Sequence, residues 1–173
     1  MSTVDVMVLG FLAEGRQHGY ELRRKIEQLH GHTRRISDGT LYPAIDRLER
    51  NGYVAKEAAP GRGRAGRHTL TLTDVGRRHL LDVLRAADGH DITDATRFFV
   101  VLTFLSLLPD RADQHAVLRR RLTFLETPAS FFYDGDRPIR AEEVVDPYRR
   151  GLLLTARATS AAEKAWIREE IDS

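Results

Sequence analysis

The chain has 173 residues, of which 42% are hydrophobic and 30% are charged, and it contains no cysteine. This is the composition of an ordinary globular protein of one or two domains, and it excludes a disulfide framework, a thiolate metal site and a thiol nucleophile. The net charge is +2, but residues 1–85 carry 15 Lys and Arg against 10 Asp and Glu, while residues 86–173 carry 12 against 15. The basic half is the part suited to meet a polyanion.

Neither a signal peptide nor a membrane span is predicted. The N-terminal stretch MSTVDVMVLGFLAEG has an acidic residue where a signal peptide has basic ones. The longest apolar run, residues 98–108, is about half as long as a bilayer requires. We therefore expect a cytoplasmic protein without membrane contact, and we interpret residues 98–108 as a core or interface helix.

Three short helices are predicted before residue 53. They cover residues 4–14, residues 19–30 and the stretch SDGTLYPAIDRLERNGY at 37–53, and each has apolar residues at helical spacing. Ser2 or Thr3 can cap the first helix, and Asn51-Gly52 is a stop signal for the third.

The third helix has two unlike faces. Leu41, Ile45 and Leu48 fall at i, i+4 and i+7, which leaves Thr40 and Tyr42 off the apolar face. Pro43 is acceptable in the first turn of a helix, where its missing N–H has no partner to lose. We therefore expect the regular helix to begin near Asp38 to Thr40, with Pro43 in its first turn.

A β-hairpin and a fourth helix complete the first half. Residues 54–57 and 67–72 are predicted strands, and the nine residues between them, AAPGRGRAG, form a basic, glycine-rich tip. Thr73 is the expected N-cap of a helix that continues to about Ala87. The order helix, helix, helix, hairpin, helix predicts a winged helix-turn-helix domain.

The polar patch ADGHD at 87–91 is the expected boundary between two domains. After it, helices are predicted at residues 91–108, at 110–126 and from Asp146-Pro147 to about residue 171, with a loop at 127–140. The predicted fold is mainly α with a small β-hairpin. It divides into a winged helix-turn-helix domain at 1–87 and a C-terminal helical domain at 88–173. We expect the second domain to hold a dimer together, because residues 98–108 are more apolar than a small free-standing helical domain needs.

The exposed N-terminal end of the third helix and the hairpin tip together predict a nucleic-acid interface. In a helix-turn-helix domain this helix enters the major groove, and basic side chains on a mobile tip can reach phosphates or a minor groove. The alternative is a solvated helix end and a solvated loop. The predicted DNA-binding residues are Tyr20, Arg34, Arg35, Ser37, Gly39, Thr40, Tyr42, Pro43, Arg47, Arg62, Arg64 and Arg67.

The sequence shows no group of residues that would form a catalytic, metal or cofactor site. His30 and His32 have no acidic or cysteine cluster nearby to complete a metal site, and Asp134 with Asp136 is better explained as turn chemistry. The aromatic side chains of the second half are candidates for effector or dimer contacts, with an ordinary place in the core as the alternative. They include Phe98, Phe99, Phe124, Tyr148 and Trp166.

Three segments resemble the PadR family of bacterial transcriptional regulators: HGYEL at 18–22, SDGTLYPAIDRLERNGY at 37–53 and TLTDVGRRHL at 71–80. Leu70 departs from the family pattern, which has a tyrosine there. RFFVVLTFLSLLPD and Trp166 resemble the family's longer-tailed subgroup. The resemblance implies a homodimeric repressor whose DNA-binding domain is residues 1–87 and whose dimerisation domain, also the candidate effector domain, is residues 88–173. It implies binding to a double-stranded DNA operator with an inverted repeat, and release by a small-molecule effector or by another signal. A winged-helix module for protein or RNA assembly, without sequence-specific DNA binding, is the alternative function.

Overall fold

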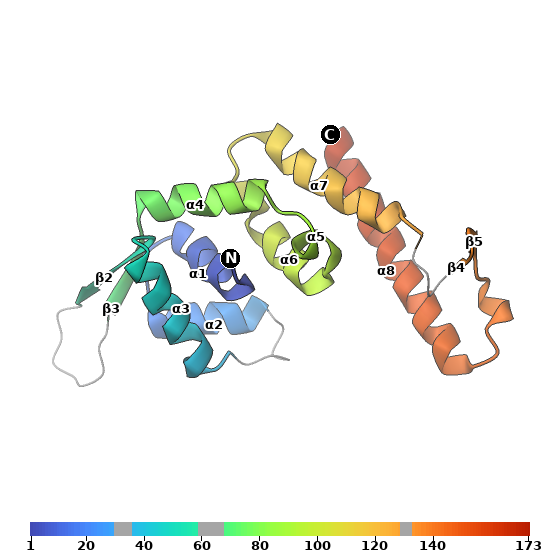
Figure 1. The fold of residues 1–173 in the computed structure, drawn as a ribbon, viewed down its shortest axis with the longest axis horizontal. Coiled ribbons are helices and arrows are strands. Elements are labelled where there is room, and N and C mark those ends of the chain that lie inside the picture. The colour runs from blue at the N-terminus through green and yellow to red at the C-terminus, as the bar shows by residue number, and fades with distance from the viewer. Residues whose placement is uncertain (30–35, 59–67, 129–132) are drawn as a thin grey trace.

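The computed structural model describes residues 1–29, 36–58, 68–128 and 133–173 of an elongated molecule (Figure 1). The first half contains α1 (Thr3–Ala13), α2 (Gly19–Leu29), α3 (Asp38–Arg50), β2 (Val54–Ala58), β3 (His68–Leu72) and α4 (Asp74–Arg85). The predicted order of three helices, a hairpin and a fourth helix is confirmed, as is the mainly α fold class.

Side-chain caps fix where several helices begin. Ser2 accepts from the Asp5 N–H in a capping box, and Thr73 accepts from the Gly76 N–H at 2.9 Å. The carboxylate of Asp146 accepts from the N–H groups of the second and third residues of the last helix, whose first residue is a proline. Each cap satisfies N–H groups that have no carbonyl one turn before them, so these predicted helix starts are confirmed.

The winged half has a three-stranded sheet with the order β1-β3-β2. β2 and β3 are antiparallel, in the register Val54↔Leu72 to Ala58↔His68. The unpredicted strand β1 (Gln17–His18) pairs with the other side of β3, with Gln17 opposite Leu70. Leu70 is therefore buried in the central strand, and β1 ties the start of α2 to the hairpin.

The expected position of Pro43 is wrong. Helix α3 begins at Asp38, so Pro43 is its sixth residue and lies in the second turn. A residue with an N–H there would bond to the Gly39 carbonyl, and proline cannot make that bond. Gly39 is exposed, so its carbonyl can be hydrated instead.

The second half departs from the prediction in two places. The single helix expected at 91–108 is instead α5 (His90–Thr93), α6 (Ala95–Phe104) and the 3₁₀ helix η1 (Leu105–Leu107). The break lies at Asp94, which has ψ 120° and caps α6 by accepting from the Arg97 N–H. The expected loop at 127–140 contains a short hairpin, β4 (Tyr133–Asp134) and β5 (Arg137–Pro138), which turns at Gly135 with φ 62°.

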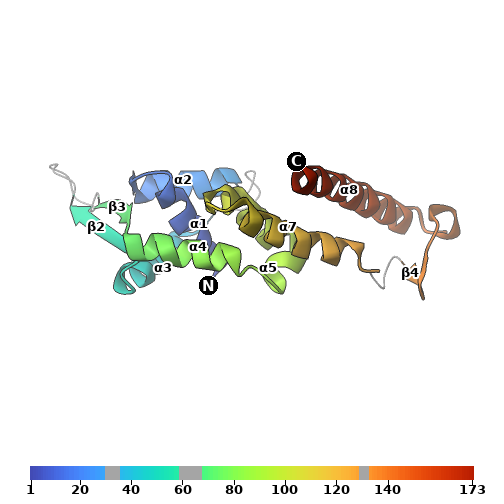
Figure 2. The ribbon, with the colours of Figure 1, turned by 90° about the horizontal axis from the view of Figure 1, so that it is seen from above.

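The long helices α7 (Arg111–Glu126) and α8 (Pro147–Asp172) pack side by side at the C-terminal end of the molecule, with the 3₁₀ helix η3 (Ala141–Glu143) before α8 (Figure 2). Within the described ranges, no helix is both long enough and apolar enough to cross a membrane.

One hydrophobic core runs through both halves. It extends from α1, α2, α3 and α4 through α6 and α7 to Ile167 of α8. At the contact between the halves, Phe104 of α6 packs edge-to-face on Phe11, with ring centroids 5.1 Å apart. The Phe104 ring also covers Gly10, where a Cβ would lie 2.6 Å from its carbon atoms. Helix α6 is therefore seated directly on α1 of the winged half.

Candidate nucleic-acid interface

Helix α3 presents a polar N-terminal end that is held in place by its buried side. Leu41, Ile45 and Leu48 are buried in the core, as predicted, while residues 37–40, 42 and 43 are exposed. The hydroxyl oxygens of Ser37 and Thr40 lie 2.9 Å apart and share a hydrogen bond. The Thr40 N–H donates to the Ser37 carbonyl at 2.9 Å, and the Ser37 side chain makes no cap hydrogen bond. This end of α3 therefore offers its hydroxyls and the N–H groups of residues 38 and 39 to an anion or to base edges.

Exposed aromatic rings continue this surface onto the start of α2. Tyr42 is 46% exposed and Tyr20 is 60% exposed. The Tyr42 ring lies over Gly19, where an added Cβ would be 3.3 Å from Tyr42 Cε1. Tyr20 stacks on His18 with ring centroids 5.7 Å apart. We name Ser37, Thr40, Tyr42, Tyr20 and His18 the α2–α3 surface. The sequence analysis did not select His18 for this surface, although the HGYEL segment contains it.

A carboxylate fixes the start of α2. Glu21 Oε2 accepts from the His18 N–H at 2.8 Å, and Glu21 Oε1 accepts from the Tyr20 hydroxyl at 3.3 Å. The backbone hydrogen bond from His18, with a smaller contribution from Tyr20, lowers the pKa of Glu21 and so favours its ionised form. One acidic side chain thus holds both the His18 backbone and the Tyr20 hydroxyl of the α2–α3 surface.

Ion pairs hold α3 at both ends. At its start, Arg23 of α2 donates to Asp38 at 2.8 Å and pairs with Glu27 at 3.2 Å. Further along, Arg47 donates to the carboxylate of Asp5, which is buried in α1. Arg47, predicted to contact DNA, therefore already has a protein partner, although its side chain is 45% exposed.

The base of the hairpin is tied closely to α4. Thr73 Oγ1 donates to the Gly52 carbonyl at 2.7 Å, and the Thr73 N–H donates to the Tyr53 carbonyl at 3.1 Å. Gly76 lies so close to Tyr53 that a Cβ would be 2.1 Å from the Tyr53 carbonyl oxygen. The glycine of the TLTDVGRRHL segment is therefore required by a backbone contact. The predicted DNA contacts Arg34, Arg35, Arg62, Arg64 and Arg67 lie outside the described residues.

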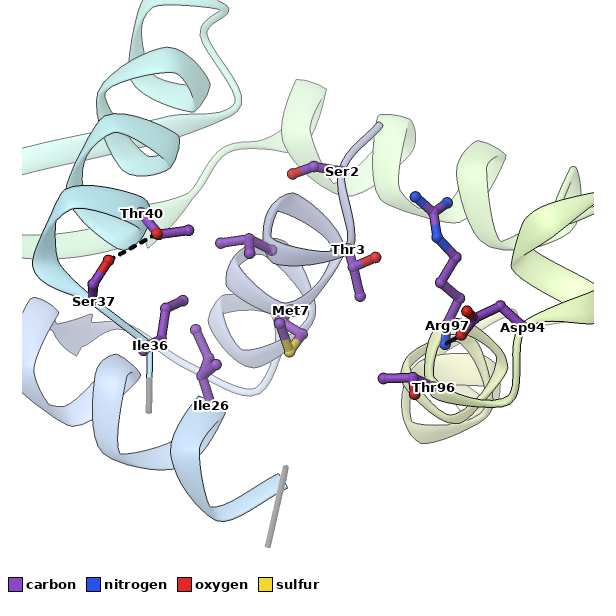
Figure 3. A pocket seen from close by; sticks show the side chains of 11 residues that line it. Ser2, Thr3, Met7, Ile26, Ile36, Ser37, Thr40, Asp94, Thr96 and Arg97 are labelled. Atoms are coloured by element: carbon purple, nitrogen blue, oxygen red, sulfur yellow. Dashed lines mark hydrogen bonds between the residues drawn. The ribbon is translucent and has the colours of Figure 1, made fainter. Parts of the chain in front are cut away.

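A cavity of about 530 Å³ lies between the start of α3 and the second half (Figure 3). Ser37 and Thr40 face it from α3, and Ser2 and Thr3 face it from α1. Asp94, Thr96 and Arg97 come from the N-terminal end of α6. The Arg97 guanidinium donates to Asp91 at 2.8 Å. The cavity thus lies between the N-terminal end of α3 and the N-terminal end of α6.

The aromatic candidates of the second half are not gathered at one place. Phe98 is fully buried, so it lies in the core, the alternative left open by the sequence. The Arg121 guanidinium lies over the Phe98 ring at 4.7 Å and over the Phe124 ring at 5.3 Å. Phe99, Tyr148 and Trp166 are exposed on the chain taken alone. None of the five lines the cavity at α3.

Within the described part of the chain, no three His, Asp or Glu side chains are grouped closely enough to hold a metal ion. His30 and His32 lie outside that part. Asp134 pairs with Arg137 across the β4–β5 turn at 3.6 Å, which is a turn contact.

Three short helices with an exposed polar end on the third, followed by a hairpin packed on a fourth helix, define a winged helix-turn-helix protein. Residues 8–82 match the model of the transcriptional regulator PadR-like family. Over 87 residues, the chain is 34% identical to the transcriptional regulator Rv3488 of Mycobacterium tuberculosis, covering 50% of this chain and 78% of that protein. The chain belongs to the PadR-like family of transcriptional regulators, and the resemblance noted in the sequence is confirmed.

Two further similarities differ in their coverage. Over 76 residues, the chain is 40% identical to an uncharacterized 37.1 kDa protein in transposon TN4556 of Streptomyces fradiae, covering 44% of this chain and 20% of that protein. The crystal structure of Bacillus subtilis PadR in complex with operator DNA is similar with a TM-score of 0.47 and 19% identity. That similarity covers 99% of this chain and 98% of that chain.

Proposed function

We propose that the protein is a homodimeric, sequence-specific DNA-binding repressor that acts in the cytoplasm on an inverted-repeat operator. The observation that carries this proposal is the α2–α3 surface, where hydroxyls and aromatic rings are exposed on a helix whose opposite face is locked in the core. A helix end of this kind can enter a major groove without moving relative to its domain.

The helix and the hairpin would have different tasks. The side chains of Ser37, Thr40 and Tyr42 would contact base edges. Gly39 and Pro43 would let α3 come close to the DNA, and Tyr20 would contact the DNA backbone beside them. Arginines of the hairpin tip (Arg62, Arg64 and Arg67) and of the α2–α3 connection (Arg34 and Arg35) would neutralise phosphates. Arg47 would reach DNA with the part of its side chain left exposed by Asp5.

Residues 88–173 would provide the dimer interface. Val145, Tyr148, Leu152 and Leu154 are exposed at the start of α8 and just before it, and exposed apolar side chains commonly mark an interaction site. Phe99 of α6 and Trp166 near the end of α8 are exposed as well. Two copies joined here would present two α3 helices to the two halves of an inverted repeat.

A small-molecule effector would act from the cavity between α3 and α6. A ligand there would contact Ser37 and Thr40 on one side and Thr96 and Arg97 on the other. Since a ligand shifts a binding equilibrium by its differential affinity for two states, a ligand that holds Ser37 and Thr40 in the DNA-free state would release DNA.

The test is a selection of duplexes from a random pool by the full-length protein, with light scattering to measure its mass. We expect one inverted repeat to be enriched and the protein to be a dimer. Specific binding should exceed random binding by about 10³-fold or more and should weaken steeply with salt. Equal binding to all duplexes, or to none, would favour the alternative of a protein- or RNA-assembly module.

Tyr42→Ala should weaken binding to the selected duplex by about tenfold to a hundredfold, because each lost base-edge contact is worth about 1–3 kcal/mol. The melting temperature should change little, since the ring lies on the outside of α3. Leu41→Ala, one residue away on the buried side, is the matched control and should lower stability by about 2–5 kcal/mol. If Tyr42→Ala destabilised the protein as much as Leu41→Ala, Tyr42 would be a core residue and would not belong to the α2–α3 surface.

A further inference from the structure

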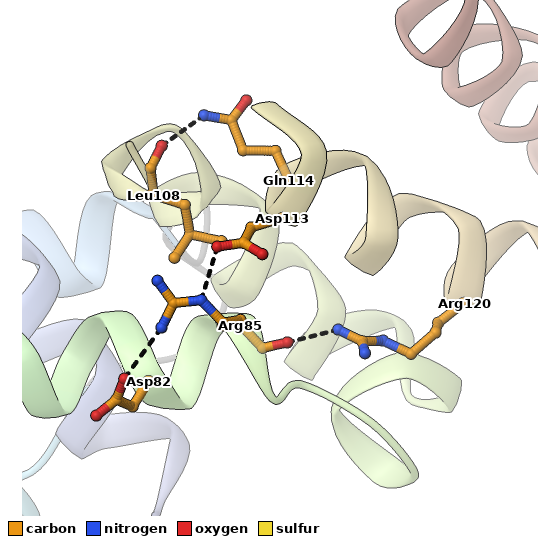
Figure 4. A network of polar contacts seen from close by, with 6 residues as sticks. All are labelled: Asp82, Arg85, Leu108, Asp113, Gln114 and Arg120. Atoms are coloured by element: carbon orange, nitrogen blue, oxygen red, sulfur yellow. Dashed lines mark hydrogen bonds and ion pairs between the residues drawn. The ribbon is translucent and has the colours of Figure 1, made fainter. Parts of the chain in front are cut away.

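Polar contacts join the end of α4 to α7 (Figure 4). Arg85 Nε donates to Asp113 Oδ2 at 2.7 Å, and Arg120 Nη2 donates to the Arg85 carbonyl at 2.6 Å. One turn before Arg85, Asp82 accepts from Arg85 Nη1 at 3.0 Å and keeps its guanidinium in place. We name Arg85, Asp113 and Arg120 the α4–α7 latch.

The latch satisfies groups that the two helices leave open. Arg85 is the last residue of α4, so its carbonyl has no N–H one turn further on, and Arg120 supplies a donor. Asp113 lies in the first turn of α7, where a negative charge is favourable. Within the described residues, Arg120 Nε is buried without a partner, and the Arg120 side chain as a whole is half-buried at the contact. Exposed ion pairs add little to stability. The latch is better suited to fixing the angle between α4 and α7.

That angle matters because α4 acts as a lever. Its 12 residues make it about 18 Å long, and its start lies at the hairpin base beside α3. A rotation of roughly 10° at the latch would move the far end of α4 by about 3 Å, which is close to the rise of one base pair. In a dimer joined through the second half, the same rotation would change the distance between the two α3 helices.

We propose that the α4–α7 latch determines which spacing between operator half-sites the dimer accepts. The three residues are positioning residues and need not touch DNA. This inference rests on the proposed function, because half-site spacing has a meaning only for a dimer on an inverted repeat. The competing explanation is that the packing of Phe104 on Gly10 and Phe11 fixes the angle without the latch.

The test compares binding to the selected inverted repeat with binding to duplexes whose two halves are moved apart or together by one and two base pairs. The latch variant is Asp113→Ala with Arg120→Met. The matched control is Glu126→Ala with Arg168→Met, which removes an exposed α7–α8 ion pair of 2.6 Å and leaves the contact with α4 intact. Both double variants lose one acid and one base, so net charge is unchanged.

The wild type and the control should lose about tenfold or more in affinity when the spacing changes by one base pair, since a rigid connection tolerates one span only. In the latch variant the same change should cost about threefold or less. An unaltered spacing profile in the latch variant would overturn the inference in favour of the Phe104 packing. If the double variant does not fold, the single variant Arg120→Met decides by the same criterion. A wild type with no preferred duplex would instead refute the proposed function itself.

Discussion

Replacing Glu163 with glutamine is expected to lower the free energy of unfolding by about 3–5 kcal/mol. Its partner Arg121 is 3% exposed and donates from Nε and Nη2 to the two Glu163 oxygens at 2.7 and 3.0 Å. The third nitrogen, Nη1, donates to the Ile92 carbonyl, and the guanidinium lies against the rings of Phe98 and Phe124. Glutamine would leave this cation buried without an opposing charge.

Urea unfolding followed by circular dichroism, at one protein concentration, measures the effect. Glu126→Gln is the control, because Glu126 pairs with Arg168 at the surface and its loss should cost about 1 kcal/mol or less. The double variant Arg121→Met with Glu163→Leu should recover most of the lost stability, since apolar groups can replace a buried pair. A Glu163→Gln protein as stable as the Glu126→Gln protein would mean that the pair is hydrated in solution.

Gly76→Ala should lower the free energy of unfolding by a similar amount, about 3 kcal/mol or more, for a steric reason. The added Cβ would lie 2.1 Å from the Tyr53 carbonyl oxygen and 2.9 Å from Leu72 Cδ1. The Tyr53 carbonyl is held by the Thr73 N–H, so it cannot withdraw without breaking the hairpin base. We expect the hairpin to separate from α4 and DNA binding to fall with stability.

Gly151→Ala is the natural comparison, because Gly151 lies in the interior of α8 with no described atom within 4 Å of an added Cβ. Alanine there should raise stability by about 0.5–1 kcal/mol through helix propensity alone. Thermal unfolding of both variants gives opposite shifts if the Tyr53 contact is as close as described. Equal shifts would contradict it.

Local signals in the sequence were enough to predict most of the winged half. The spacing of Leu41, Ile45 and Leu48 gave the correct rotation of α3, because a helix buries one side over successive turns. Thr73 and Asp146 identified helix starts because a cap acts within three residues. Pro43 was misplaced because we assumed that a proline requires the first turn, whereas the exposed Gly39 carbonyl, which Pro43 leaves without a helical donor, is open to water instead.

Contacts between distant residues could not be predicted from one sequence. Arg121 and Glu163 are 42 residues apart, as are Asp5 and Arg47, and nothing local joins the members of each pair. Strand β1 has two residues, which is too short to show an alternating pattern. The run at 98–108 is apolar in nearly every direction, so the sequence could not separate buried Phe98 from exposed Phe99.

The seating of Phe104 on Gly10 also has a consequence for how the molecule melts. Since the winged half and the C-terminal helices share one hydrophobic core, neither can lose its packing while the other keeps its own. A calorimetric scan should therefore show a single transition whose calorimetric and van't Hoff enthalpies agree, where two loosely linked lobes would give two peaks. Heat would thus unfold the α2–α3 surface and the C-terminal helices in one cooperative event.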